Sequence, residues 1–231
     1  MPSLPTINNV PLTSQDAACE KSVDEITVSE VTPPTIPGAA ARTTIAMAPA
    51  ALADNTALLT HLKDVINLVY YTIDSAHGGF WHERQPGNDG RSSVDELRSF
   101  ILAGQLALAW RPESSQTDAA DLMGCVVVKM LDPTTGYFGL LLCDPAYRGS
   151  GLGSALVRFA EDWARARGAK VMELSFLMPE GWRHAFKERL AEWYFRLGYQ
   201  VTRVAAVADE VPHLGPLLKQ PATFRIAQKV L

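Results

Sequence analysis

A glycine-rich loop between an apolar segment and an amphipathic helix constrains the fold of this chain more than any other feature. Residues 137–143 are apolar and compatible with a β-strand, and Asp144-Pro145 ends that segment with a turn signal. Residues 154–167 repeat apolar side chains at the spacing of one helix face. The sequence therefore predicts a strand, a loop over residues 148–153, and then a helix.

The composition of this loop predicts an anion-binding site. Gly149, Gly151 and Gly153 leave backbone N–H groups unobstructed at the start of the helix, where the helix dipole is positive. Arg148 adds a fixed positive charge beside them. We therefore expect a phosphorylated cofactor at the loop.

Two familiar phosphate-binding loops do not fit this spacing. A dinucleotide-binding loop needs Gly-x-Gly-x-x-Gly directly after the strand, whereas the glycines here stand at alternate positions. A nucleoside-triphosphate loop needs a lysine before its final Ser or Thr, but Ser154 and Ala155 follow Gly153. Arg148, Gly151 and Gly153 instead match the pattern Arg/Gln-x-x-Gly-x-Gly/Ala, and the loop resembles the acetyl-coenzyme A loop of the GNAT superfamily of N-acetyltransferases.

A second motif further along the chain matches the same superfamily. Tyr194 stands four residues before Gly198-Tyr199, in a helix predicted over residues 184–197. This arrangement resembles the superfamily's second signature, and a predicted strand separates the two motifs in the superfamily's order. The resemblance covers residues 122–207, and more loosely the region from about residue 43.

The resemblance implies an α+β fold: a mixed, mostly antiparallel twisted sheet with helices on both faces, in which the central strands that carry Cys143 and Glu173 splay apart. The residue pattern predicts strands over residues 43–47, 106–110, 122–130, 137–143, 170–177, 200–207 and 222–229. It predicts helices over residues 53–73, 94–103, 154–167 and 184–197. Residues 42–231 would form this domain. Residues 1–41, which are rich in proline and poor in large apolar side chains, would form a partly ordered N-terminal arm.

The resemblance also implies which residues bind the cofactor, acetyl-coenzyme A. They are Leu142, Cys143, Arg148, Gly149, Ser150, Gly151, Leu152, Gly153, Ser154 and Lys187. Lys187 departs from the superfamily's pattern, because many members carry Asn at this position, seven residues before the helical tyrosine. A lysine there could reach a phosphate or a substrate carboxylate, or lie in solvent.

Tyr194 and Glu173 are the candidate catalytic residues. Tyr194 matches the superfamily tyrosine whose phenol lies near the thioester sulfur, which implies a proton donor; a core aromatic is the alternative. Glu173 is a carboxylate in an otherwise apolar strand, which favours a general base, but an exposed strand face, a structural ion pair and a water chain as base stay open. The backbone N–H of Cys143 would polarise the thioester carbonyl, whereas burial would make its thiol a poor nucleophile.

We expect the acceptor pocket to draw on the loop after the first helix, where aromatic and charged side chains lie near glycines, and on the late hairpin loop. The candidate substrate-binding residues are Tyr70, Tyr71, Trp81, His82 and Glu83. The implied function is transfer of an acetyl group from acetyl-coenzyme A to a primary amine of a small molecule, by direct attack in a ternary complex. Acetylation of a protein or peptide and a non-catalytic coenzyme A-binding sensor are the alternatives.

The whole chain sets outer bounds on function. Its 231 residues carry a net charge of −4, which argues against a general nucleic-acid binder. No apolar run approaches the ~18 residues that cross a bilayer, so we expect no membrane association. Three widely spaced cysteines and the lack of a secretory signal favour a cytoplasmic location. His77 and His82 have no partner at metal-ligand spacing, so no metal site is expected. A homodimer is compatible with the sequence, which does not determine the oligomeric state.

Overall fold

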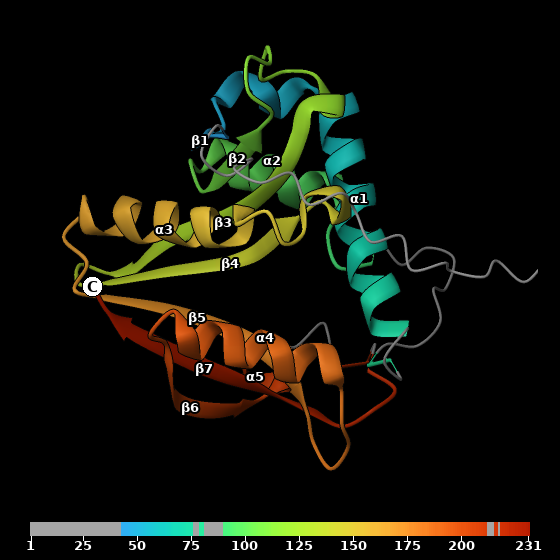
Figure 1. Cartoon of the computed structure of the whole chain (residues 1–231), viewed down its shortest axis with the longest axis vertical. Coiled ribbons are helices and arrows are strands. Elements are labelled where there is room, and N and C mark those ends of the chain that lie inside the picture. The colour runs from blue at the N-terminus through green and yellow to red at the C-terminus, as the bar shows by residue number, and fades with distance from the viewer. Residues whose placement is uncertain (1–42, 76–78, 81–89, 212–214, 217) are drawn as a thin grey trace, which may run out of the picture. The chain divides into compact units, whose positions relative to one another are not determined.

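A seven-stranded sheet organises the chain (Figure 1). The computed structural model describes residues 43–75, 79–80, 90–211, 215–216 and 218–231; the predicted N-terminal arm lies outside them. The strands are β1 (Thr44–Met47), β2 (Leu106–Trp110), β3 (Leu122–Asp132), β4 (Thr135–Cys143), β5 (Val171–Pro179), β6 (Gln200–Ala206) and β7 (Ala222–Val230). The helices are α1 (Thr56–Ser75), α2 (Val94–Leu102), α3 (Leu152–Arg165), α4 (Ala185–Arg196) and the short α5 (Val207–Glu210). The predicted mixed α+β class is confirmed.

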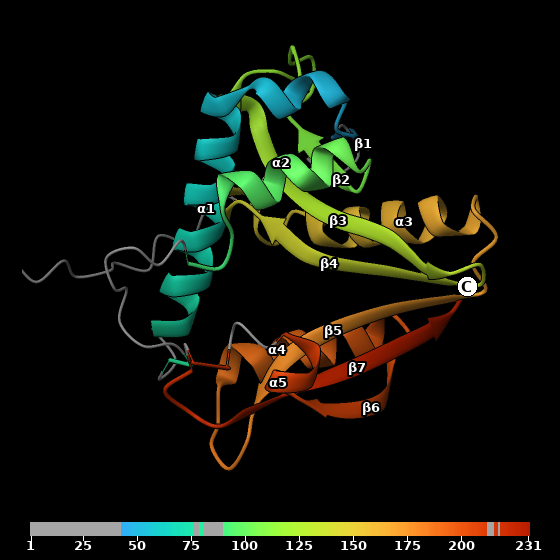
Figure 2. The same cartoon turned by 180° about the vertical axis from the view of Figure 1, so that it is seen from behind.

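The sheet divides into two parts between its two central strands. The strand order is β1-β2-β3-β4-β5-β7-β6, and every neighbouring pair is antiparallel except β4 and β5. The parallel pairing of β4 with β5 begins at Thr135 and Val171 and ends at Phe138 and Leu174. Beyond this point the two strands diverge (Figures 1 and 2). The predicted splay of the central strands is therefore confirmed.

A β-bulge in β4 begins two residues after Phe138, the last residue of β4 that pairs with β5. In the ladder with β3, Leu142 pairs with Cys125, and the register then shifts so that Leu140 and Leu141 oppose the single Val126. Leu140 has a φ of +46°, a left-handed conformation that strains a residue with a branched side chain. An extra residue bends the strand that contains it. The bulge therefore helps to turn the end of β4 away from β5.

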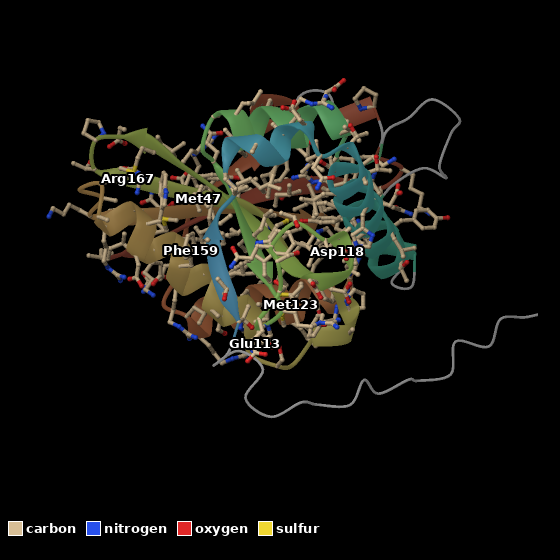
Figure 3. All side chains as sticks on the ribbon, turned by 90° about the horizontal axis from the view of Figure 1, so that it is seen from above. Met47, Glu113, Asp118, Met123, Phe159 and Arg167 are labelled. Carbon is tan, nitrogen blue, oxygen red and sulfur yellow. The ribbon has the colours of Figure 1, made fainter. Side chains whose placement is uncertain are left out.

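Helices cover both faces of the sheet, as predicted. On one face α3 and α4 enclose a core that contains Phe138 and Leu156, while on the other α1 and α2 pack over Leu140 and Leu142 (Figures 1 and 2). In a regular strand every second residue faces the same side of the sheet. The extra residue of the bulge interrupts this alternation, so Phe138 faces the core under α3 and α4, whereas Leu140 and Leu142 face the core under α1 and α2. Seen from above, Met47 of β1 and Phe159 of α3 lie along the first of these cores (Figure 3).

Local capping residues set the helix starts. The helix predicted from residue 53 begins at Thr56, because residues Ala50–Asp54 form a 3₁₀ turn and the Leu58 N–H donates to Asn55 Oδ1 at 3.0 Å. Ser93 caps α2 by accepting from the Glu96 N–H at 3.1 Å. None of the helices in the described ranges is both long and apolar enough to cross a membrane.

Candidate active site

A cavity of about 330 Å³ occupies the gap between the diverging ends of β4 and β5. Residues 139–143 of β4 line one wall, and residues 174–177 of β5 line the other. Side chains of α1 and α4 complete the lining from the two faces of the sheet. The split in the sheet thus connects both helical layers to one site.

The glycine-rich loop lies at one end of this cavity. Asp144 forms the turn that precedes the loop, since its Oδ1 accepts from the Ala146 N–H at 2.8 Å. Gly149 and Gly151 adopt positive φ angles of 76° and 89°, which are favourable only for glycine. Gly151 is the N-cap of α3 and provides no side chain to bond the first-turn amides.

These first-turn amides are available to an anion. The Leu152 N–H has only a long contact of 3.4 Å to Ser150 Oγ, which itself donates to the Tyr147 carbonyl. Within the described residues, the N–H groups of Gly153 and Ser154 have no acceptor. Arg148 and Gly153 line the cavity. The loop therefore fits a phosphorylated ligand that continues into the split sheet.

Tyr194 reaches the cavity from α4. Its side chain is 6% exposed, and its ring packs against Phe138 and Phe176 with centroids 6.2 and 5.6 Å apart. Burial raises the pKa of the hydroxyl above its ordinary value of 10.0. The hydroxyl thus stays protonated at neutral pH and is suited to donate a proton. Within the described part of the chain it forms no side-chain hydrogen bond.

Cys143 lines the cavity at the end of β4, just past the bulge. Burial raises the pKa of its thiol to about 12. A thiol with that pKa is a poor nucleophile at neutral pH. The side chain is therefore suited to pack against a ligand, and any contribution of Cys143 to chemistry would come from its backbone.

The structure does not bring Glu173 and Tyr194 together. Glu173 is paired with Tyr137 where β4 and β5 still run side by side, and it is absent from the cavity lining. Its carboxylate accepts from Gln228 Nε2 at 2.8 Å. Ser175, two residues along on the same face of β5, does line the cavity and hydrogen-bonds Tyr137 with 3.1 Å between the hydroxyls.

The predicted substrate residues have different locations. Tyr70 of α1 lines the cavity, whereas Tyr71 is 45% exposed and does not. Trp81, His82 and Glu83 lie outside the described residues. Lys187, predicted to contact the cofactor, lines the cavity with its ammonium 5.7 Å from the centroid of the Phe80 ring.

Sequence reasoning missed three polar residues of the lining: Arg91, Tyr137 and Ser175. Tyr137 and Ser175 sit on adjacent strands at the point of divergence, so a correct strand register would have found them. Arg91 has no such signal, because only the packing of α1 against the residues before α2 brings it to the cavity. Among the described residues, no group of three or more His, Cys, Asp or Glu could hold a metal ion.

The fold of this chain is similar to that of several solved acetyltransferases. The fold is similar to that of yncA from Salmonella typhimurium, whose structure contains its cofactor acetyl-CoA (TM-score 0.52, 16% identity, covering 82% of this chain and 94% of that chain). It is also similar to an acetyltransferase from Streptococcus agalactiae (TM-score 0.51, 19% identity, 82% and 99% covered). An aminoglycoside 6'-N-acetyltransferase complexed with coenzyme A gives a TM-score of 0.50 at 15% identity, with 74% and 89% covered.

A family model identifies the protein family of this chain. The chain belongs to the acetyltransferase (GNAT) family, whose model matches residues 81–199. That range contains β2 to β5, the glycine-rich loop, α3 and α4. No curated protein sequence matches the chain.

Proposed function

We propose that this protein transfers an acetyl group from acetyl-coenzyme A to a primary amine of a small molecule. The observation that carries the proposal is the cavity in the split sheet, which has an anion-binding helix start at one end and a buried, protonated tyrosine at its side. Family membership and the coenzyme A ligands of yncA and the aminoglycoside enzyme support the donor.

The donor would lie along the α3 side of the cavity. The amides at the start of α3 and the guanidinium of Arg148 would bind its phosphates. Lys187 would contact the donor from α4. Acetyl-coenzyme A supplies an acetyl group activated as a thioester.

Tyr194 and the backbone of Cys143 would act on the reacting atoms. The Tyr194 hydroxyl, which stays protonated, would donate its proton to the leaving sulfur. The Cys143 N–H, which follows the bulge in β4, would donate to the thioester carbonyl oxygen. Both groups are held by the fold before a substrate arrives, so they require little reorganisation.

The amine must lose a proton, and Glu173 lies outside the cavity lining. We propose that the proton leaves through water beside the Tyr137–Ser175 pair, with Glu173 as the nearest carboxylate on that face of β5. Glu173→Gln should then lower kcat/KM only modestly compared with substitution of Tyr194. A loss as large as that of the tyrosine variant would make Glu173 the direct base.

The cavity volume favours a small acceptor over a peptide. About 330 Å³ is at the lower end of the range for small-ligand sites, which runs from roughly 300 to 1,000 Å³. The test is thiol release from acetyl-coenzyme A with the purified chain and a panel of small amines and lysine-containing peptides. We expect release with small amines. Release with peptides alone would overturn the small-molecule acceptor, and binding of coenzyme A without release from any amine would support a sensor.

A further inference from the structure

The charged residues of the cavity lining all have the same sign. They are Arg91, Arg148 and Lys187, and no Asp or Glu occurs among the described lining residues. Arg148 belongs to the loop before α3, where the donor phosphates would bind. Arg91 belongs to a different part of the site and is not accounted for by the donor.

Arg91 lies on the α1–α2 face of the sheet. Its guanidinium carbon is 5.6 Å from the centroid of the Tyr70 ring, and Tyr70 packs against the core beneath α1 and α2. Its positive charge also opposes the burial that raises the pKa of the Tyr137 hydroxyl. Since α3, α4 and Tyr194 lie on the other face, Arg91 reaches the cavity from the face opposite the proposed proton donor.

The backbone of Arg91 is fixed between two anchored residues. Asn67, buried in α1, forms two hydrogen bonds with Ser92: its Nδ2 donates to the carbonyl and its Oδ1 accepts from the N–H, both at 3.0 Å. Gly90 has a φ of +81° and packs so closely on Asn67 that a Cβ would lie 2.9 Å from the amide carbon. Holding the backbone reduces the conformational entropy that a ligand contact would cost.

Arg91 has no carboxylate partner within 4.0 Å among the residues that the structure describes, whereas Arg183 and Arg203 pair with Glu188 and Glu210, both at 2.7 Å. The planar guanidinium matches a carboxylate through two parallel hydrogen bonds. An acceptor with several positive charges would instead meet Arg91 as a like charge.

We propose that Arg91 binds a carboxylate of the acceptor, so that the substrate is an amino acid or another primary amine that carries a carboxylate. This inference rests on the proposed function and specifies its substrate class. The aromatic side chains of Phe80 and Phe224, which also line the cavity, would contact the apolar part of such a substrate.

The test compares acceptors that share one carbon skeleton and differ in one group: an α-amino acid, its carboxamide and its aminophosphonate. We expect kcat/KM to be about 10- to 100-fold higher for the carboxylate than for the carboxamide, the effect of one charge-assisted hydrogen-bonded pair. Arg91→Gln should abolish this preference. Arg158→Gln, which removes an exposed arginine of α3 outside the cavity, is the matched control and should retain it.

Three outcomes would overturn the inference while leaving the proposed function intact. They are equal or faster acetylation of the carboxamide, a preference for the aminophosphonate, and an Arg91→Gln variant that retains the preference. Calorimetric binding of the amino acid in the presence of coenzyme A is a second readout, and Arg91→Gln should weaken it by the same factor. Coenzyme A binding without thiol release from any acceptor would refute the proposed function instead, and equal amino-acid affinity of wild type and variant would then also refute the role of Arg91.

Discussion

Tyr194 combines a buried ring with a hydroxyl that forms no side-chain hydrogen bond within the described residues, so replacing it should separate chemistry from folding. Tyr194→Phe keeps the ring contacts with Phe138 and Phe176 and removes only the proposed proton donor. We expect kcat to fall by about 10²-fold or more, with little change in the affinity for acetyl-coenzyme A. Stopped-flow or steady-state thiol release and calorimetry measure the two quantities.

The pH dependence gives this assignment an independent check. Because burial raises the pKa of Tyr194 above 10.0, the hydroxyl stays protonated at every lower pH, and it should cause no alkaline loss of kcat below pH 10.0. A kcat that rises with pH through the neutral range in wild type, but not in Tyr194→Phe, would contradict a proton donor and indicate a tyrosinate base.

The reactivity of Cys143 shows whether the acetyl group is first transferred to the enzyme as an acetyl-cysteine. With a thiol pKa of about 12, the thiolate fraction at neutral pH is on the order of 10⁻⁵. Alkylation of Cys143 by iodoacetamide, followed by peptide mass spectrometry, should therefore be slow in the folded chain and fast after unfolding. Cys143→Ala should still release thiol at a rate close to wild type, whereas an inactive variant with normal coenzyme A binding would support an acetyl-cysteine route.

At the scale of the elements, Gly124 of β3 supports the end of β4 beside the bulge. A Cβ at this position would lie 2.3 Å from the carbonyl oxygen of Leu142, a backbone atom that cannot move without displacing the strand. Gly124→Ala should lower the free energy of unfolding by about 1–3 kcal/mol in urea titrations and weaken coenzyme A binding.

Gly153→Ala is the matched control for this substitution. Its Cβ would meet Cys143 and Trp193 at 3.5 Å, an ordinary van der Waals distance, and alanine favours a helix more than glycine does. The free energy of unfolding should therefore stay the same or rise. Equal destabilisation by both variants would mean that the crowding at Gly124 does not control stability.

The strands and helices were predictable because their apolar periodicity is local. The site was predictable only where a motif carried it, as for Arg148 and Tyr194. The bulge at Leu140 was not predictable, because a run of apolar residues on β4 contains no sign of the extra residue that exchanges the two faces. Alternation along β5 predicted which face of the strand Glu173 lies on. It could not predict that Glu173 lies where β4 and β5 are still paired, outside the cavity lining. The position of Arg91 was not predictable either, because it is set by the hydrogen bond between its neighbour Ser92 and Asn67 of α1, two residues distant in sequence.

At the scale of the whole molecule, four tyrosines make the free energy of unfolding depend on pH in the alkaline range. Burial raises the pKa of Tyr70, Tyr137, Tyr194 and Tyr199, and for Tyr199 the nearby Glu161 carboxylate adds to the effect. Above their unfolded pKa of about 10 the folded chain retains protons that the unfolded chain loses. The free energy of unfolding should therefore be unaffected by these groups below pH 10 and fall above it, by about 1.4 kcal/mol per pH unit for each tyrosine.

Urea unfolding at several pH values measures this slope. In Tyr199→Phe the alkaline slope should be smaller, although the neutral stability is also lower, because the Tyr199 hydroxyl donates to the buried Glu161 at 2.8 Å. A slope that is the same in wild type and variant would exclude Tyr199 from the effect.

The early end of the β4–β5 ladder leaves an unpaired strand edge whose amides should exchange with solvent rapidly. Past Phe138, amides of β4 that point toward β5 have no partner on that strand, so they should exchange with deuterium much faster than amides that point toward β3. Saturating coenzyme A should slow exchange along this edge and raise the melting temperature, so that the ligand stabilises the sheet as well as serving as a reactant.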